Sequence, residues 1–496
     1  MGVIIRQSIQ NTVISYVGIV LGFISTILLF PRILTPDQYG LTRLFVSLAL
    51  ICAQFAHLGI KNTIIRFFPY FQSSQKEKSK LLTLTLLIPF VGFLLFTVLY
   101  LLGQDIFISY YDDRSALFDE YFLFLIPLVF ATLFFEVLNN YVRALQDSIT
   151  GSFLNEVVMR ALIIVLLIVH YFELISFPTF MIGFVATYCI EPFYLLIYLY
   201  RHGELSLSYP KLDKRAKFIK GMGVYGAYSL LGGLATLLVG NIDIIMLGAM
   251  TNLSDTAVYA IAFYVGSVIA VPQRSINKIA VPILAGLIKE KAFTQVESLY
   301  KRTSLTQVIS GVLLYIGIWA NMHNLMDLLP EEYHGAEWVI IIIGAAKLFN
   351  MATGINGHII MNSKYFRFDL YTNILLIAIT ITSNYFFIQY WGMLGAAIAT
   401  ALSIFIYNFI KFIFVWIKFD MQPFRWNALA VLIIAAICLG ISWQIPYLYN
   451  FVIDVVVRSG IITIIFAGSI LLFDLSEDVK NLLQEGYKRV QKLDLF

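Results

Sequence analysis

The chain contains apolar runs, repeated from end to end, that are long enough to cross a lipid bilayer. A membrane-spanning helix needs about 20 predominantly apolar residues. The runs predict about fourteen such helices, at residues 8–31, 41–66, 81–102, 121–143, 151–171, 177–200, 222–250, 256–284, 303–323, 336–361, 368–390, 393–417, 427–446 and 452–473. Only 13% of the 496 residues are charged, about half the share in soluble domains. We therefore expect an all-α integral membrane protein.

Basic and acidic residues alternate between successive connections. Lys and Arg gather at 76–80, 201–220, 289–302, 364–367 and in the tail, whereas Asp and Glu gather at 105–120 and 327–332. Because basic connections stay on the cytoplasmic side, this pattern predicts cytoplasmic N- and C-termini. We expect a multi-pass membrane protein whose two ends lie on the cytoplasmic side.

The sequence contains no pattern that indicates a catalytic, metal or cofactor site. Cys52, Cys189 and Cys438 lie inside apolar runs, without the spacing of a metal site or a disulfide framework. No HExxH, GxSxG or P-loop pattern occurs, and a net charge of +4 is too small to indicate nucleic-acid binding. We predict no metal, no cofactor, no catalytic residue and no enzymatic activity.

The two halves of the chain resemble each other in a parallel sense. Residues 34–40 (LTPDQYG) resemble residues 253–259 (LSDTAVY), and the Ala-Thr pair at 186–187 recurs at 399–400 with a similar offset. Repeats of the same topology typically surround a central cavity. We therefore predict two six-helix lobes plus two extra C-terminal helices. Their limits are 1–200 for the first lobe, 201–221 for a cytoplasmic basic linker, 222–418 for the second lobe, 419–474 for the extra helices and 475–496 for an amphipathic cytoplasmic tail.

Two pairs of basic residues lie within the predicted spans at corresponding places in the repeat. Arg274 and Lys278 are four residues apart, as are His57 and Lys61, so each pair shares one helical face. An ionisable residue at membrane depth costs about 2.5–3.5 kcal/mol and therefore indicates a polar cavity or a partner. We predict that both pairs, with Arg66, form a cationic belt that binds a pyrophosphate. Under the alternative, Lys61 and Lys278 reach the cytoplasmic interface and His57 makes a core hydrogen bond.

Other charged residues in the spans leave alternatives open. Arg32 and Arg43 flank the first outer turn, where they anchor the interface or bind phosphate at the outer mouth. Lys347 is a further candidate for phosphate binding. Asp243 either pairs across helices with Lys347 or binds a coupling H⁺ or Na⁺.

Two further pairs of opposite charge favour a structural role. Glu156 and Arg160 are four residues apart, the spacing of an ion pair on one helix, and Glu136 with Arg143 is the second candidate pair. Pro272 and Pro282 predict breaks in the helix that carries Arg274.

Four segments resemble a known family. Residues 30–40 (FPRILTPDQYG), residues 58–60 with Arg66, residues 241–248 and residues 390–400 (YWGMLGAAIAT) look like motifs of the polysaccharide (O-antigen-type) flippases in the multidrug/oligosaccharidyl-lipid/polysaccharide exporter superfamily. The resemblance implies two lobes that alternate their access to the two sides of the membrane. It also implies an undecaprenyl-pyrophosphate-linked oligosaccharide as cargo, as in lipopolysaccharide synthesis. The implied partners are this substrate, the bilayer, and a glycan polymerase or ligase.

The sequence was also weighed against several other functions, which differ in the cavity or loops that they need. A multidrug-type cation exporter would need an acidic cavity, which the basic pairs argue against. A lipid II flippase shares the expected fold. A polyprenyl-linked glycan polymerase or ligase would need large outer loops, and the predicted ones are short. A channel subunit or scaffold is not excluded by any feature of the sequence.

Overall fold

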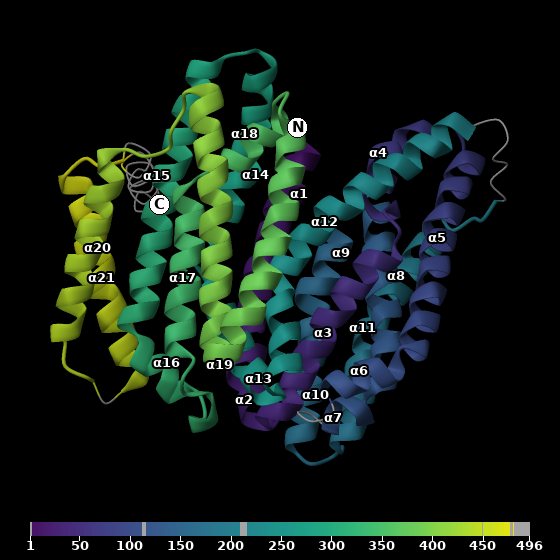
Figure 1. Cartoon of the computed structure of the whole chain (residues 1–496), viewed down its shortest axis with the longest axis horizontal. Helices are drawn as coiled ribbons and strands as arrows, with labels where there is room; N and C mark the ends of the chain where they lie inside the picture. The colour runs from purple at the N-terminus through teal and green to yellow at the C-terminus, as the bar shows by residue number, and fades with distance from the viewer. Residues whose placement is uncertain (1, 112–115, 209–215, 449, 477–479, 481–496) are drawn as a thin grey trace, which may run out of the picture. The chain divides into compact units, whose positions relative to one another are not determined.

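The computed structural model describes residues 2–111, 116–208, 216–448, 450–476 and 480. Every regular element within these ranges is a helix (Figure 1), which confirms the predicted all-α class. The predicted amphipathic tail lies almost entirely outside the described residues. Contacts divide the chain into two compact units, unit 1 at 1–260 and unit 2 at 261–496. Each unit is described by itself.

Unit 1 begins with a long interrupted helix and continues with helices that pack around α8. Its elements are α1 (Gly2–Phe23), the π-helical η1 (Ile24–Leu29), α2 (Phe30–Ile33), α3 (Pro36–Ala56), α4 (Ile60–Phe67), η2 (Phe68–Phe71), α5 (Gln75–Leu102), α6 (Gln104–Tyr111), α7 (Ala116–Glu120), η3 (Phe122–Phe124), α8 (Leu125–Ala144), α9 (Ile149–Phe153), the π-helical η4 (Leu154–Val158), α10 (Met159–Tyr171), α11 (Phe177–Arg201) and α12 (Ala216–Met250). Helix α8 contacts α3, α4, α5 and α11. Its buried face, which includes Val137, Leu138 and Tyr141, forms much of the core.

Unit 2 is organised around α15. Helix α13 (Leu253–Val268) enters it from unit 1, followed by α14 (Val271–Lys289), α15 (Phe293–Ala320), α16 (Met322–Leu328), η5 (Glu331–Tyr333), α17 (Glu337–Ala352), α18 (Asn356–Asn362), α19 (Phe366–Phe419), α20 (Trp426–Gln444) and α21 (Phe451–Leu472). Helix α15 packs against α14, α17, α20 and α21. Cys438 is buried in this core, and all three cysteines of the chain are free thiols.

Ten described helices are long and apolar enough to cross a membrane, or up to thirteen when each of three bent pairs is counted as one span. Helix α19 is 54 residues long, and a straight helix of that length would extend about 80 Å. It reverses at Gly392, whose φ of 53° is accessible mainly to glycine. Hydrogen bonds between its arms, such as Tyr407 Oη to Asn373 Oδ1 at 2.8 Å, hold them antiparallel. The glycine of the YWGMLG motif therefore serves this turn, and the count of fourteen spans stays a prediction.

A break separates α13 from α14, and the two helices differ in direction by 48°. Pro272 lies in the first turn of α14. A proline is tolerated there, because a backbone N–H in the first turn has no partner within the helix. The predicted break at Pro272 is therefore present. The second predicted break is wrong, because α14 continues through Pro282 to Lys289.

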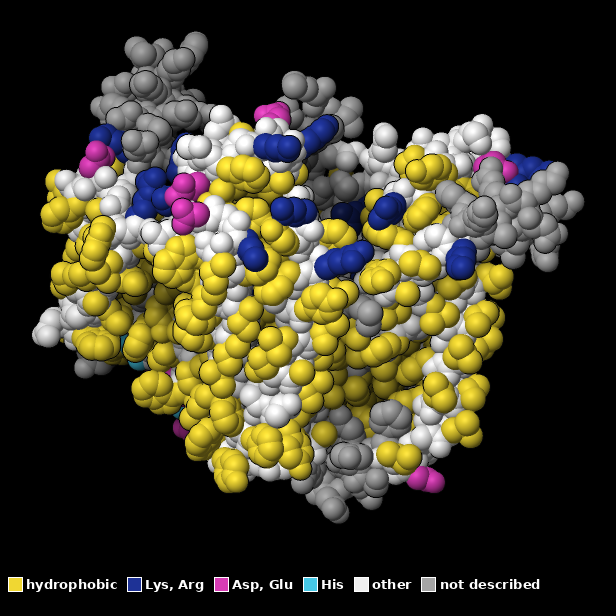
Figure 2. Space-filling model, turned by 45° about the horizontal axis from the view of Figure 1, so that its top comes forward, with side chains coloured by type: hydrophobic (Ala, Val, Ile, Leu, Met, Phe, Trp, Pro, Cys, Tyr) yellow, Lys and Arg dark blue, Asp and Glu magenta, His cyan; other side chains and the backbone are white. Residues whose placement is uncertain are grey.

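The surface has the character of a membrane protein. On the face drawn in Figure 2, hydrophobic side chains form a broad area, and Lys and Arg gather toward one edge of it. Exposed Leu, Ile, Val and Phe side chains are numerous on α5, α20 and α21. In a soluble protein so much exposed apolar surface would cause aggregation, whereas in a bilayer it faces lipid.

Candidate functional site

The basic pair in unit 2 lies on the exposed side of α14. Arg274 and Lys278 are both exposed, one helical turn apart. The polar residues beside them face inward: Asn350 Nδ2 donates to Gln273 Oε1 at 3.1 Å, and Gln307 Nε2 donates to Asn277 Oδ1 at 3.0 Å. These bonds to α17 and α15 fix the rotation of α14. The two cations are thereby presented outward from the unit, and no ion pair is recorded for them within the described ranges.

In unit 1, the first basic residue of the matching pair has a structural role. His57 is only 2% exposed and lies at the break between α3 and α4. The N–H of Gly59 donates to His57 Nδ1 at 2.9 Å, so Nε2 carries the proton and donates to Gln54 Oε1, also at 2.9 Å. Both ring nitrogens are used. His57 therefore offers no group to a phosphate in this structure and is left out of the proposed site, in line with the alternative core hydrogen bond.

Lys61 and Arg66 follow on α4 and differ in their surroundings. Lys61 Nζ lies 2.9 Å from Glu136 Oε1 on α8. Glu136 is therefore paired across helices and not with Arg143 as expected, since residues seven apart on a helix are about 10 Å apart. The Arg66 guanidinium lies over the Tyr225 ring, 4.2 Å from its centroid, and Arg66 is exposed. Of these two cations of unit 1, Arg66 is therefore the more accessible to a ligand.

These cations belong to different units: Lys61 and Arg66 to unit 1, Arg274 and Lys278 to unit 2. Their convergence on one cavity, and the lobe boundaries proposed from the repeat, stay predictions.

Two arginines lie near the start of the chain. Arg43 Nη2 donates to Thr26 Oγ1 at 3.0 Å, and its guanidinium lies 4.9 Å from the Tyr39 ring centroid and 5.2 Å from that of Phe30. Thr26 belongs to the π-helical segment η1, and such segments frequently mark functional sites. Arg32 is exposed at the end of α2.

The remaining predicted residues have protein partners. Tyr259 Oη donates to Asp243 Oδ2 at 2.5 Å, and Lys347 Nζ lies 4.9 Å from the Phe263 ring centroid. Arg160 Nη2 lies 2.9 Å from Glu156 Oε2, and Arg160 also donates to the carbonyl of Gly18 on α1. The ion pair lies along one helical stretch, and the bond from Arg160 to Gly18 joins that stretch to α1.

One buried charged network was missed in the sequence. Lys411 is 4% exposed, and its Nζ lies 2.6 Å from Asp369 Oδ1 and also donates to Tyr407 Oη. Asn373 Nδ2 donates to Asp369 Oδ2 at 3.0 Å. The network ties the two arms of α19 together. A lysine inside an apolar run was itself the signal, but Asp369 lies at the start of the preceding predicted span, at 368–390, and local spacing does not pair it with Lys411.

A second missed pair lies on α21. Asp454 is fully buried and Arg458 is 4% exposed; Arg458 Nη2 lies 3.1 Å from Asp454 Oδ1. Their spacing of four residues is the signal that identified Glu156 and Arg160. Asn324 Nδ2 and His323 Nε2, both on α16, lie 2.5 and 3.1 Å from Asp454 Oδ2.

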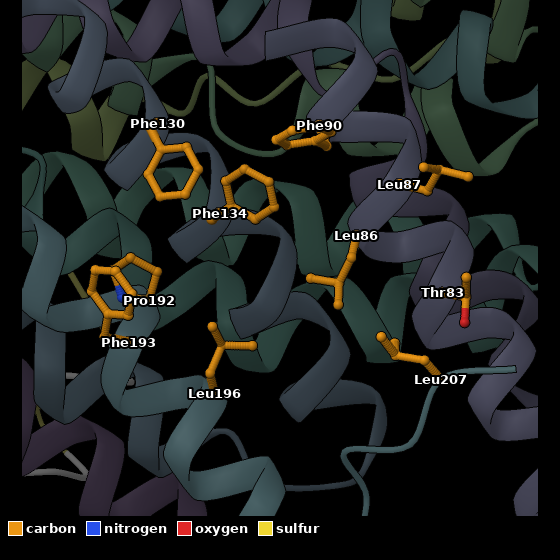
Figure 3. A pocket seen from close by; sticks show the side chains of 10 residues that line it. All are labelled: Thr83, Leu86, Leu87, Phe90, Phe130, Phe134, Pro192, Phe193, Leu196 and Leu207. Atoms are coloured by element: carbon orange, nitrogen blue, oxygen red, sulfur yellow. The ribbon is translucent and has the colours of Figure 1, made fainter. Parts of the chain in front are cut away.

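An apolar pocket of about 410 Å³ lies in unit 1 between α5, α8 and α11. Figure 3 shows Leu, Phe and Pro side chains from these helices around it, with Thr83 as the polar member. Leu207 covers one end, where the N–H of Ser208 donates to Thr83 Oγ1 at 3.1 Å. The lining suits a hydrocarbon chain and offers nothing to a charged headgroup.

No cluster of three metal-ligating side chains occurs among the residues that the structure describes. A bundle of long apolar helices with exposed hydrophobic side chains, and with charged residues paired in its interior, has the features of a multi-pass membrane protein.

The chain belongs to the polysaccharide biosynthesis protein family, whose model matches residues 4–288. A probable low-salt glycan biosynthesis flippase, Agl15 of Haloferax volcanii, is 21% identical over 222 residues, which is 44% of this chain and 47% of that protein. The match thus spans about half the length of this relative.

Solved transporter structures share the fold. The lipid II flippase MurJ in an inward closed conformation superposes with a TM-score of 0.72 at 13% identity, covering 94% of this chain and 99% of the other. An inward-facing multidrug resistance transporter of the MATE family gives 0.59 at 13% identity, covering 84% and 98%. A MOP superfamily transporter from Pyrococcus furiosus gives 0.54 at 14% identity, covering 84% and 95%. At these identities the likeness establishes the fold alone.

Proposed function

We propose that this protein is a flippase that moves an oligosaccharide linked to undecaprenyl pyrophosphate from the cytoplasmic to the outer leaflet. The family and the glycan flippase among its relatives support a lipid-linked glycan as cargo. The observation that carries the proposal is the cation pair of α14, Arg274 and Lys278, exposed on one face of a helix that is anchored on its other side.

In this proposal the pyrophosphate binds to Arg274 and Lys278, with Arg66 from the other unit as a third cation. A guanidinium binds phosphate oxygens in a bidentate manner, and an ammonium adds a point charge. The glycan occupies a watery cavity while the carrier's hydrocarbon chain stays in the bilayer. Alternating access of the two lobes then releases the headgroup outside.

Several finer points belong to the same proposal. Asp243, buried beside Tyr259, is the candidate for H⁺ or Na⁺ coupling. The setting is the inner membrane of a bacterium, with both termini cytoplasmic, during O-antigen lipopolysaccharide synthesis, and a glycan polymerase or ligase acts on the product. A lipid II flippase is the second candidate of the same class, since MurJ shares the fold.

Transport in proteoliposomes tests the proposal. The substrate carries a fluorophore on its terminal sugar, and quenching by an impermeant reductant reports its transfer between leaflets. Each charge-assisted hydrogen bond is worth about 1.5–3 kcal/mol, so we expect Arg274→Ala/Lys278→Ala to slow transport at least ~tenfold. Lys289→Ala is the matched control, because Lys289 is an exposed cation at the end of the same helix. Undiminished transport by the double variant would refute the assignment.

A further inference from the structure

A second cavity, of about 390 Å³, lies in unit 2 where α15 and α20 end and α16 begins. Its volume falls within the range of about 300–1,000 Å³ typical of small-molecule sites. It is lined by Trp319, Ala320, Met322, His323, Trp443, Ile445, Tyr447 and Arg458. Four of these eight residues have aromatic rings, and we call this cavity the aromatic pocket.

The rings of the aromatic pocket are open to a ligand. Trp443 is 65% exposed and Tyr447 is 48% exposed. The His323 ring stands edge-on to Tyr447, with centroids 5.3 Å apart. Aromatic residues at membrane interfaces usually form a belt toward the lipid headgroups. Here the rings share the wall of one cavity, which a belt does not require.

The polar wall of the pocket is rigid. The Asp454 carboxylate accepts from Arg458 Nε and Nη2, His323 Nε2, Asn324 Nδ2 and the N–H of Leu448. Arg458 Nη1 also donates to the carbonyl of Ser442 at the end of α20, at 2.5 Å. These bonds join α16, α20 and α21 at the pocket.

The same bonds determine the charge of the pocket. Asp454 neutralises Arg458, so the pair presents no net charge to a ligand. His323 binds Asp454 through Nε2, and its Nδ1 has no recorded partner among the described residues. Nδ1 is therefore available to a hydroxyl group.

We propose that the aromatic pocket binds a neutral pyranose sugar. The C–H face of a pyranose packs on an aromatic ring, here Trp443 or Tyr447, and a hydroxyl bonds to His323 Nδ1. An anionic phospholipid headgroup would need an uncompensated cation, and the only basic group in the lining besides His323 is Arg458, which is already paired. The site lies away from α14 and would exist whether or not that helix binds pyrophosphate.

The test is ligand binding to the purified full chain in lipid nanodiscs. Methyl glycosides of glucose, galactose and N-acetylglucosamine serve as probes, and saturation-transfer NMR detects their binding. At the binding free energy per heavy atom that is usual for small ligands, a monosaccharide glycoside has a Kd of ~1 mM. We expect at least one glycoside to bind in this range and Trp443→Ala to weaken it at least ~tenfold, with Trp443→Phe intermediate because it keeps a ring.

Trp338→Ala is the matched control, since Trp338 is similarly exposed (63%) in unit 2 but does not line the pocket. It should bind like the wild type. Three results would overturn the proposal: no binding of any glycoside, equal binding by wild type and Trp443→Ala, or binding of glycerol phosphate in place of the sugars. Because Trp443 is exposed, its substitution should leave the fold intact, which the melting temperature of the variant checks.

Discussion

The two units contain cavities of nearly equal size and opposite chemistry. The apolar pocket of unit 1, about 410 Å³, is lined almost entirely by Leu, Phe and Pro, whereas the aromatic pocket of unit 2, about 390 Å³, has an ion pair in its wall. Both are lined in part by helices long and apolar enough to cross a membrane, α5, α8 and α11 in unit 1 and α15, α20 and α21 in unit 2. The comparison shows that a few side chains, and not the helical scaffold, decide what a cavity in this fold can bind.

The largest effect should come from breaking the ion pair of the aromatic pocket. Arg458→Ala leaves the carboxylate of Asp454 buried without its main partner, and such losses cost about 3–5 kcal/mol. We expect the free energy of unfolding, measured by denaturant titration in detergent, to fall by that amount. Asp474→Asn is the control: it removes the exposed pair of Asp474 with Lys480 and should change the stability by less than ~0.5 kcal/mol. If both substitutions lowered the free energy of unfolding equally, the buried pair in the aromatic pocket would contribute no more than an exposed pair. That result would contradict the proposed difference between the two pockets.

A positive charge introduced into the apolar pocket should destabilise the protein. Leu86→Lys places an ammonium among the side chains of α5, α8 and α11, where the lining offers no carboxylate. At membrane depth the cost is about 2.5–3.5 kcal/mol. Leu86→Met keeps the volume and polarity and should cost less than ~1.5 kcal/mol. Denaturant titration measures the free energy of unfolding of both variants. If Leu86→Lys were as stable as Leu86→Met, water would have to hydrate the lysine in the pocket.

The smallest effect on stability should come from a carboxylate of unit 1 that lies outside the candidate membrane spans. Asp147, between α8 and α9, accepts hydrogen bonds from Thr150, Tyr198 and the N–H of Ile149. Burial alone would raise the pKa of this carboxyl, but these bonds outweigh it and hold the pKa below its ordinary value. The ionised form is favoured in the folded state, so its stabilisation is present above the unfolded pKa and is lost as the pH falls through the folded one.

Asp147→Asn should therefore reduce the free energy of unfolding by ~1 kcal/mol at neutral pH. The difference from the wild type should shrink as the pH falls below about 3.9, the pKa of an unperturbed Asp. Unfolding of both proteins across this pH range checks the sign. A difference that is constant with pH would show that the carboxylate charge does not matter.

Much of the fold followed from the sequence, because length and apolarity alone define a membrane-spanning helix. Both ends of α11 and α21 agree with the expected ones within two residues. The span expected at 151–171 agrees equally well with α9, η4 and α10 taken together. The turn in the YWGMLG motif was also placed correctly, since Gly392 has the positive φ that few other residues adopt. The continuity of α14 through Pro282 was not predictable, because neighbouring helices decide whether a proline breaks a membrane helix.

The candidate site was predicted less completely. The outward presentation of Arg274 and Lys278 depends on Gln273 and Asn277 binding α17 and α15, and such contacts do not appear in a single helix pattern. The partner of Lys61, Glu136, comes from a helix distant in the sequence. Local spacing identified the pair of Glu156 and Arg160, and the same rule, applied to α21, would have identified Asp454 and Arg458.

Transport of two cargoes that differ only in their linkage is the most direct test of the flippase proposal. Both carry the same fluorescent oligosaccharide and the same undecaprenyl chain, one joined through pyrophosphate and the other through an uncharged ether. The account predicts that wild-type proteoliposomes move the pyrophosphate-linked lipid between leaflets and leave the ether-linked lipid in place. Equal rates for both lipids would contradict it, because the cations of α14 would then have no part in recognising the cargo.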